Sequence, residues 1–66
     1  MPAFVYVPYD PESARVVKKR TPRSAVRWFR EEAGATSRSR AHLNTEDGRC
    51  LAAYVDGEFY TFDQKK

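Results

Sequence analysis

The hydrophobic pattern near the start of the chain predicts two short strands. Residues 3–8 are β-branched and aromatic, which is typical of a strand, and Pro8 ends the run. Residues 13–20 fit either of two structures. A short helix capped by Asp10 is one of them, and a second strand is the other. We favour the strand, because two adjacent valines in this segment are β-branched and the first strand needs a partner.

The next segment predicts an amphipathic helix at about residues 22–33. Thr21 is a good N-cap and Pro22 has the backbone torsion that the first helical position requires. Gly34 stands where a left-handed residue commonly ends a helix. At 100° per residue, one side of this helix is apolar and the opposite side is basic. The apolar side carries Ala25, Val26, Phe29 and Ala33. The basic side carries Arg23, Arg27 and Arg30.

The remainder of the chain predicts three strands joined by two tight turns. The turns are Asp47-Gly48 and Asp56-Gly57, because Asp-Gly pairs suit the positive φ angles of hairpin turns. The expected strands are 38–45, 49–55 and 58–63. We therefore predict an α+β fold, an antiparallel sheet of about five strands in the order β-β-α-β-β-β with one helix packed on it.

The face of the sheet that forms the core is left open by the sequence. A shift of one residue in strand register moves every side chain to the other face. One register needs a bulged first turn and a two-residue second turn, and it buries Leu43, Leu51, Ala53, Val55, Tyr60 and Phe62. The other register buries Cys50, Ala52, Tyr54 and Phe59 instead.

The chain has 66 residues, which corresponds to one small domain spanning 1–66. With a single cysteine, Cys50, no internal disulfide can form, and a free thiol indicates a reducing compartment. Together with His42 it makes no four-ligand zinc site, so we expect no metal and no cofactor. Nine aromatic residues supply the core instead. The chain shows neither a signal peptide nor a membrane span, so we expect a cytoplasmic protein.

Charge is distributed unevenly along the chain, although the net charge is only +3. Residues 15–40 hold nine lysines and arginines against two glutamates. Such asymmetry favours a polyanionic or acidic partner. Six of these cations form a run that enters the predicted helix and continues along its basic side. We expect this contiguous surface to be the partner-binding site, with the members Lys18, Lys19, Arg20, Arg23, Arg27 and Arg30.

A second, smaller set of cations is predicted on the third strand. Arg38 and Arg40 alternate, so both are expected to project from one face, with Tyr54 or Tyr60 nearby. Phosphate-binding cations beside aromatic rings are typical of single-strand nucleic-acid binding. An ordinary polar sheet face over a core explains the same pattern and is the more common case. Trp28, at the flank of the helix, is interpreted as a core residue.

No pattern in the sequence indicates catalysis. His42 has no neighbouring serine or carboxylate that would make a nucleophile or a general base, and the three glycines are isolated rather than grouped in a phosphate loop. We therefore expect no catalytic residues and no small-molecule substrate.

In the order of its elements and turns, the chain resembles small phage anti-CRISPR proteins of the type I-F group, which bind the Cascade complex. The similar stretch is about residues 21–62. It includes 44–48, then Leu51-Ala52-Ala53-Tyr54, then Asp56-Gly57. Members of that group have a short strand pair, an arginine-containing helix and a three-stranded meander.

The resemblance implies a small inhibitor that blocks target-DNA binding by steric occlusion, in the host cytoplasm if the chain is of phage origin. The expected partner is therefore a protein subunit of a nucleoprotein complex, with no membrane involved. The alternative is a small regulator or accessory protein that binds DNA or RNA directly. Both functions need the same accessible positive surface.

Overall fold

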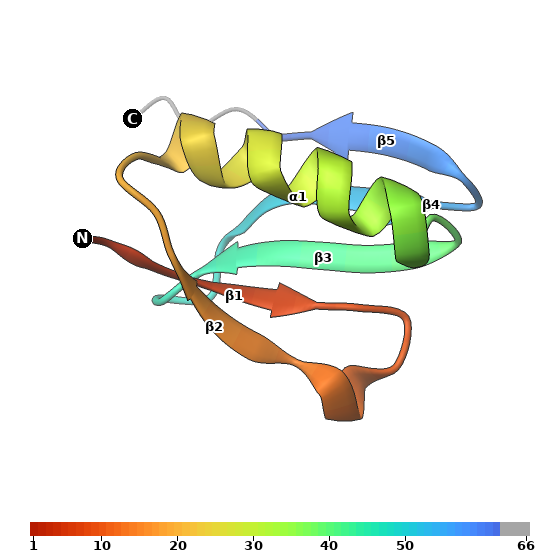
Figure 1. Ribbon diagram of the computed structural model, residues 1–66, viewed down its shortest axis with the longest axis horizontal. Helices are drawn as coiled ribbons and strands as arrows, with labels where there is room; N and C mark the ends of the chain where they lie inside the picture. Colours follow the sequence, from red (N-terminus) through yellow and green to blue (C-terminus); the bar gives the residue numbers. More distant parts are fainter. Residues whose placement is uncertain (63–66) are drawn as a thin grey trace.

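A five-stranded antiparallel sheet carries one helix across one of its faces (Figure 1). The computed structural model describes residues 1–62. The predicted α+β fold and the order β-β-α-β-β-β are confirmed. In chain order the elements are β1 (Ala3–Val7), β2 (Arg15–Lys18), α1 (Pro22–Thr36), β3 (Arg40–Thr45), β4 (Cys50–Val55) and β5 (Glu58–Thr61).

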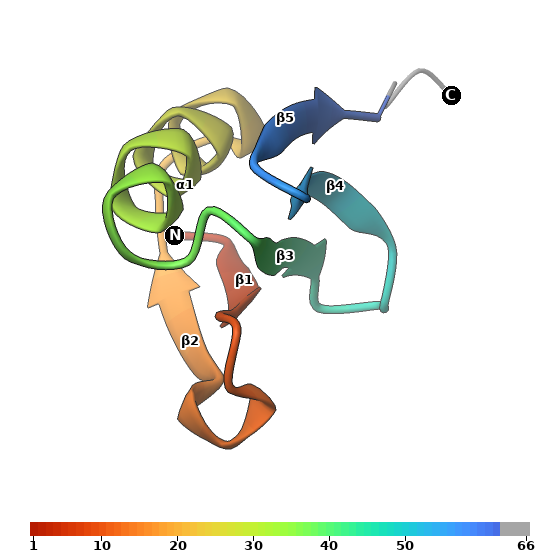
Figure 2. The ribbon, with the colours of Figure 1, turned by 90° about the vertical axis from the view of Figure 1, so that its right-hand side faces the viewer.

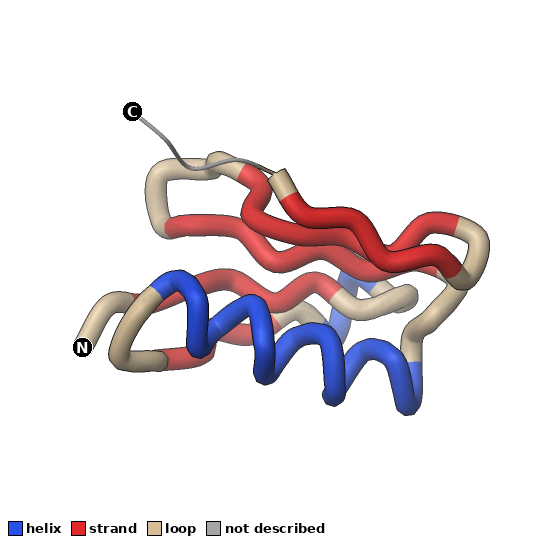
Figure 3. Tube along the Cα trace, turned by 90° about the horizontal axis from the view of Figure 1, so that it is seen from above, coloured by secondary structure: helices blue, strands red, loops and turns tan. Residues whose placement is uncertain are grey.

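The strands lie in the spatial order β2-β1-β3-β4-β5, and every neighbouring pair is antiparallel. Both edge strands, β2 and β5, have only four residues. Short edge strands offer few free backbone groups to other chains. Seen from above, the helix lies entirely on one side of the sheet (Figure 3).

The ambiguous segment after β1 contains both structures that its sequence allows. Pro11–Ser13 forms a short 3-10 helix, and the Asp10 carboxylate accepts a hydrogen bond from the Glu12 N–H at 3.1 Å. Strand β2 follows at once and pairs with β1, as expected for its two valines.

The core lies between α1 and the sheet. Helix residues Ala25, Phe29 and Ala33 are fully buried, as the helical periodicity predicts. They pack on the sheet residues Phe4, Tyr6, Ala41, Leu43, Leu51, Ala52 and Tyr54.

The structure decides between the two registers of the meander. Tyr54 is buried and Phe59 packs against the core, whereas Val55 and Tyr60 are 49% and 46% exposed. The register that buries Val55 and Tyr60 is therefore wrong.

Leu51 is nevertheless 1% exposed and belongs to the core cluster. The pairing of β3 with β4 shifts between Leu43 and Asn44, so Leu51 is an extra residue in β4. Such a bulge bends the strand and lets Leu51 and its neighbour Ala52 both reach the core.

The two predicted turns are present. Asp56 and Gly57 both have positive φ, at 53° and 86°, as a two-residue hairpin turn requires. At the longer turn, Gly48 has a φ of 98° and its N–H donates to the Thr45 carbonyl. Strand β5 was expected to span residues 58–63, but it ends at Thr61, before Phe62, and Asp63 lies outside the described residues.

The helix continues beyond its predicted end, so the assignment of Gly34 as a left-handed cap is wrong. The helix ends at Thr36, and Ser37 follows it as the C-cap. Gly34 is required for packing instead. A Cβ atom at this position would lie 2.9 Å from the Tyr54 hydroxyl oxygen. That hydroxyl donates to the Arg30 carbonyl at 3.0 Å, so the missing side chain lets β4 bond directly to the helix.

A double-mutant cycle tests this contact. Alanine is about 1 kcal/mol more favourable than glycine inside a helix, but at position 34 we expect no gain while the Tyr54 hydroxyl is present. In a Tyr54→Phe background, Gly34→Ala should stabilise the protein by about 1 kcal/mol, because the obstructing oxygen is gone. Urea unfolding of the four proteins measures the coupling. Equal effects of Gly34→Ala in both backgrounds would contradict the packing role.

The other face of the sheet, which we call the uncovered face, has no described element packed on it (Figure 2). Strand pairing and alternation define it. The central strand β3 presents the polar side chains Arg40, His42 and Asn44 to it, and apolar side chains lie on the strands to either side. These apolar side chains are Val5, Val7, Val16, Ala53, Val55 and Tyr60.

Candidate functional site

The start of α1 is fixed by a capping box. The Thr21 hydroxyl accepts a hydrogen bond from the Ser24 N–H, and the Ser24 hydroxyl accepts one from the Thr21 N–H, both at 3.1 Å. These bonds satisfy two N–H groups that a helix start leaves free. Pro22 fixes the first turn. The cations that follow are therefore held on a rigid element.

Arg23, Arg27 and Arg30 form one line on the exposed side of this helix, which we call the arginine ridge. Their spacing of four and three residues keeps them neighbours on the helix surface, over a length of about 10 Å. Within residues 1–62, no carboxylate forms an ion pair with any of the three. The Arg30 guanidinium lies 5.2 Å from the centre of the Phe59 ring, so this member also supports the fold.

The charges of α1 oppose its dipole. The positive end of a helix dipole is the N-terminus, where acidic side chains stabilise and basic ones destabilise. The first turn of α1 has no acidic residue and the last turn has no basic residue. Arg20 and Arg23 instead flank the positive end, and Glu31 and Glu32 lie toward the negative end. This arrangement costs helix stability and adds positive charge at the start of the helix.

The other flank of α1 holds cations against aromatic rings. The Lys19 ammonium lies 5.2 Å from the centre of the Trp28 ring, and the Arg15 guanidinium lies 5.8 Å from it. Arg15 also lies 5.4 Å from the Tyr6 ring and 3.6 Å from the Glu32 carboxylate. These contacts hold the Arg15 and Lys19 side chains against the protein surface, because the quadrupole of an aromatic ring attracts a cation above its face.

The predicted six-cation surface is thus distributed over several parts of the molecule. The arginine ridge holds three of its members together, and the exposed Arg20 lies just before the helix. Lys19 lies on the Trp28 flank. Lys18 pairs with Ala3 and alternates with the half-buried Val17, so it lies on the uncovered face.

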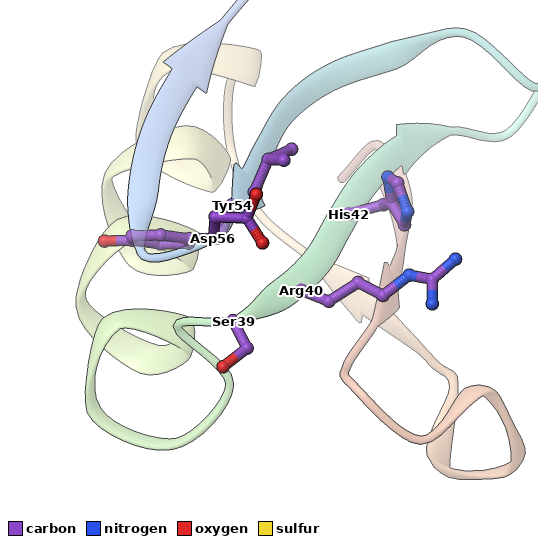
Figure 4. A pocket seen from close by; sticks show the side chains of 6 residues that line it. Ser39, Arg40, His42, Tyr54 and Asp56 are labelled. Carbon is purple, nitrogen blue, oxygen red and sulfur yellow. The ribbon is translucent and has the colours of Figure 1, made fainter.

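The prediction that Arg38 and Arg40 share one strand face is wrong, because β3 begins only at Arg40. Arg38 lies in the turn after α1, and its Nε donates to the Gly34 carbonyl at 3.3 Å. Arg40 projects from the uncovered face next to His42, away from the helix, whereas Tyr54 extends toward the helix (Figure 4). A shallow hollow of about 400 Å³ lies here, lined by Ser39, Arg40, His42, Tyr54, Val55 and Asp56.

Sequence reasoning missed the role of Arg15. It counted this residue as one more cation, but the structure places it between two rings and a carboxylate. The pairing of Tyr6 with Arg15 across β1 and β2 is what brings them together. The sequence did not indicate how β1 and β2 are aligned, and this alignment would have placed Arg15 beside Tyr6.

The shifted pKa values lie away from the arginine ridge. The hydrogen bond from Tyr60 to the Glu58 carboxylate raises the pKa of Tyr60, and the Thr45 hydroxyl beside Asp47 lowers the pKa of that carboxyl. Partial burial raises the pKa of the Cys50 thiol, which keeps it protonated and unreactive. In the described part of the chain, no three His, Cys, Asp or Glu side chains gather as a metal site.

Comparison with known proteins adds no relative. No protein-family model matches the chain, and no curated protein or solved structure matches it. Of the helices in residues 1–62, none is long and apolar enough to cross a membrane. Function must therefore be argued from the arginine ridge itself.

Proposed function

We propose that this chain is a small, non-enzymatic cytoplasmic binding protein that blocks or modulates a nucleic-acid-handling complex, with the arginine ridge as its contact surface. The observation that carries the proposal is the ridge: three neighbouring guanidinium groups on a rigid helix, none ion-paired within residues 1–62. Guanidinium groups bind carboxylates and phosphates in a planar, two-bonded geometry. A row of them fits a surface that is rich in either group.

The arrangement against the helix dipole supports the same proposal. Local rules of stability are typically broken at functional sites, where another requirement dominates. Placing Arg20 and Arg23 at the positive end of α1 weakens the helix but strengthens the attraction for anions. The resemblance to type I-F anti-CRISPR proteins gives the mechanism: the bound protein occupies the path that target DNA needs. Long-range attraction speeds this docking.

A competition experiment tests the proposal. A purified type I-F Cascade complex is mixed with its target duplex and increasing amounts of this protein, and a gel shift measures the bound DNA. We expect the wild-type protein to abolish DNA binding. The double variant Arg23→Glu/Arg27→Glu should lose at least about tenfold in potency, because two attractive contacts become repulsive. Arg30 is left unchanged because its side chain packs on Phe59.

The matched control is Arg40→Glu/Arg49→Glu. It changes the net charge by the same amount, but both residues lie away from the arginine ridge. This control should inhibit like the wild type, and circular dichroism should show both variants folded, since exposed charges affect stability little. Full DNA binding at a large excess of wild-type protein would contradict the proposal.

The gel shift of the protein alone on random duplex distinguishes the alternative function. A direct nucleic-acid binder shifts the duplex without any complex, and its affinity falls with salt by a slope near −0.9 per neutralised phosphate. Such a shift, lost in Arg23→Glu/Arg27→Glu but kept in the control, would replace inhibition of a complex by direct binding.

A further inference from the structure

Strand β2 is the outermost strand on one side of the sheet (Figure 1). The Lys19 N–H donates to the Pro2 carbonyl at 3.2 Å, which extends the register of β1 and β2 by one hydrogen-bonded pair. Bonded and non-bonded pairs alternate in an antiparallel ladder. The backbone groups of Val17 therefore point toward β1, whereas those of Val16 and Lys18 point outward. In the described part of the chain, nothing pairs with these two N–H groups and two carbonyls.

The two faces beside this edge differ in character. On the helix side, Arg15 and Lys19 both lie near the Trp28 ring, and the Arg15 side chain is 56% exposed. On the uncovered face, Val16 is 63% exposed and lies beside Val5 in the same row. Figure 2 shows that β2 extends away from α1, so the helix does not cover this edge. The edge matches a strand whose side chains are alternately acidic and apolar.

The charge of the edge discriminates between possible partners. Four of the six residues 15–20 are lysine or arginine. Positive charges on an edge strand repel the same edge of another copy, but they attract an acidic strand. Within residues 1–62, the one ion pair of these cations joins Arg15 to Glu32 at 3.6 Å. Exposed ion pairs contribute little free energy, so an incoming carboxylate can replace Glu32.

We infer that the outer edge of β2 binds an extended acidic segment of a partner protein, which joins the sheet as a sixth, antiparallel strand. Over about four residues, the backbone of this segment pairs with Val16 and Lys18. Its apolar side chains cover Val16, and its carboxylates reach Arg15 and Lys19. Main-chain hydrogen bonds provide affinity in such strand addition, and the alternating side chains provide specificity. This contact is separate from the arginine ridge and goes beyond the proposed function.

Titration with a synthetic decapeptide of alternating glutamate and valine tests the inference. Calorimetry measures the affinity, and the fluorescence of the single tryptophan, Trp28, reports the location because the Lys19 ammonium lies 5.2 Å from its ring. We expect a dissociation constant below about 500 μM at low salt, weakening as salt increases. A peptide with lysine in place of glutamate should not bind. Absence of binding at about 1 mM peptide, or equal binding of both peptides, would overturn the inference.

Methylation of the peptide backbone distinguishes strand addition from attraction between charges alone. In an antiparallel pair, the residue opposite Val16 lies on the same face and directs its N–H at β2. Because the valines of the peptide cover Val16, their N–H groups form the hydrogen bonds. N-methylation of the valines should weaken binding at least about tenfold, and N-methylation of the glutamates should change it less than about threefold. Equal effects of the two would contradict strand addition. This series uses the wild-type protein throughout.

Two pairs of protein variants locate the contact. Val16→Pro removes an outward N–H and should weaken binding at least about tenfold, because proline is tolerated on an edge strand where the N–H faces solvent. Val16→Thr keeps the N–H and should bind within about threefold of the wild type. Lys19→Glu should lose at least about fivefold, whereas Arg49→Glu makes the same charge change in the turn after β3 and should not. Normal binding by folded Val16→Pro would place the peptide elsewhere and overturn the inference.

The same titration separates a nucleic-acid ligand from an acidic strand. Binding of a ten-nucleotide oligothymidylate, with no binding of the glutamate–valine peptide, would replace the inferred partner by a single-stranded nucleic acid. The proposed function is tested independently. Arg23→Glu/Arg27→Glu should lose inhibition of Cascade but bind the peptide within about threefold, and Val16→Pro should do the reverse. Failure of strand addition and failure of the proposed function are therefore distinguishable.

Discussion

Replacing Phe29 with alanine is expected to lower the free energy of unfolding by about 3–5 kcal/mol. The Phe29 side chain is fully buried, and its ring is the centre of an aromatic cluster. The centres of the Tyr54, Tyr6 and Phe59 rings lie 5.7, 5.9 and 6.2 Å from its own. Removing the ring loses its burial and leaves a cavity that three rigid rings cannot close.

Such a loss is comparable to the whole stability of a small domain, so the variant should be largely unfolded at 25 °C. Urea titration followed by Trp28 fluorescence measures it, since Trp28 is the single tryptophan and packs at the edge of the same cluster. Tyr9→Ala is the control. Tyr9 is 63% exposed, so this variant should unfold within about 0.5 kcal/mol of the wild type. A small effect of Phe29→Ala would mean that the helix packs differently.

The second large effect concerns the bulge in β4. Leu51→Ala is expected to cost about 2–5 kcal/mol, because the side chain is 1% exposed within the core cluster. Strict alternation along β4 would place Leu51 and Val55 on the same face. Leu51 is instead the extra residue of the bulge in β4, so the alternation is interrupted after it. Leu51 is therefore buried, whereas Val55 is half exposed on the other face.

Val55→Ala is therefore the matched control for Leu51→Ala. It removes a smaller, half-exposed side chain from the end of the strand and should cost less than about 1 kcal/mol. Both variants are measured by urea unfolding. Similar losses for the two would show that β4 is regular. A larger loss for Val55→Ala would restore the register that the structure rejects.

Several features of this fold were predictable because their causes are local. Thr21 and Pro22 fixed the helix start, since a cap needs only the next three residues. Asp56-Gly57 fixed the second hairpin turn, because positive φ at two successive positions is a property of that dipeptide. The periodicity of Ala25, Phe29 and Ala33 identified the buried side of the helix.

Other features depended on residues distant in the sequence. Glycine is the residue that most often ends a helix, yet the role of Gly34 is determined by the Tyr54 hydroxyl, twenty residues later in the chain. Arg38 and Arg40 alternate as strand residues do, but β3 starts between them because Arg38 closes the end of α1. Rules based on neighbouring residues do not predict these contacts.

The sequence alone determined the class of the fold, the order of its elements, the start and the buried side of α1, and the gathering of cations in the middle of the chain. The tertiary structure decided which cations lie next to one another, which face of the sheet is core and how a bulge brings Leu51 into it. The reason is physical. Caps, turns and helical periodicity arise from neighbours within a few residues, whereas register joins strands far apart in the chain, and a shift of one residue there exchanges the two faces.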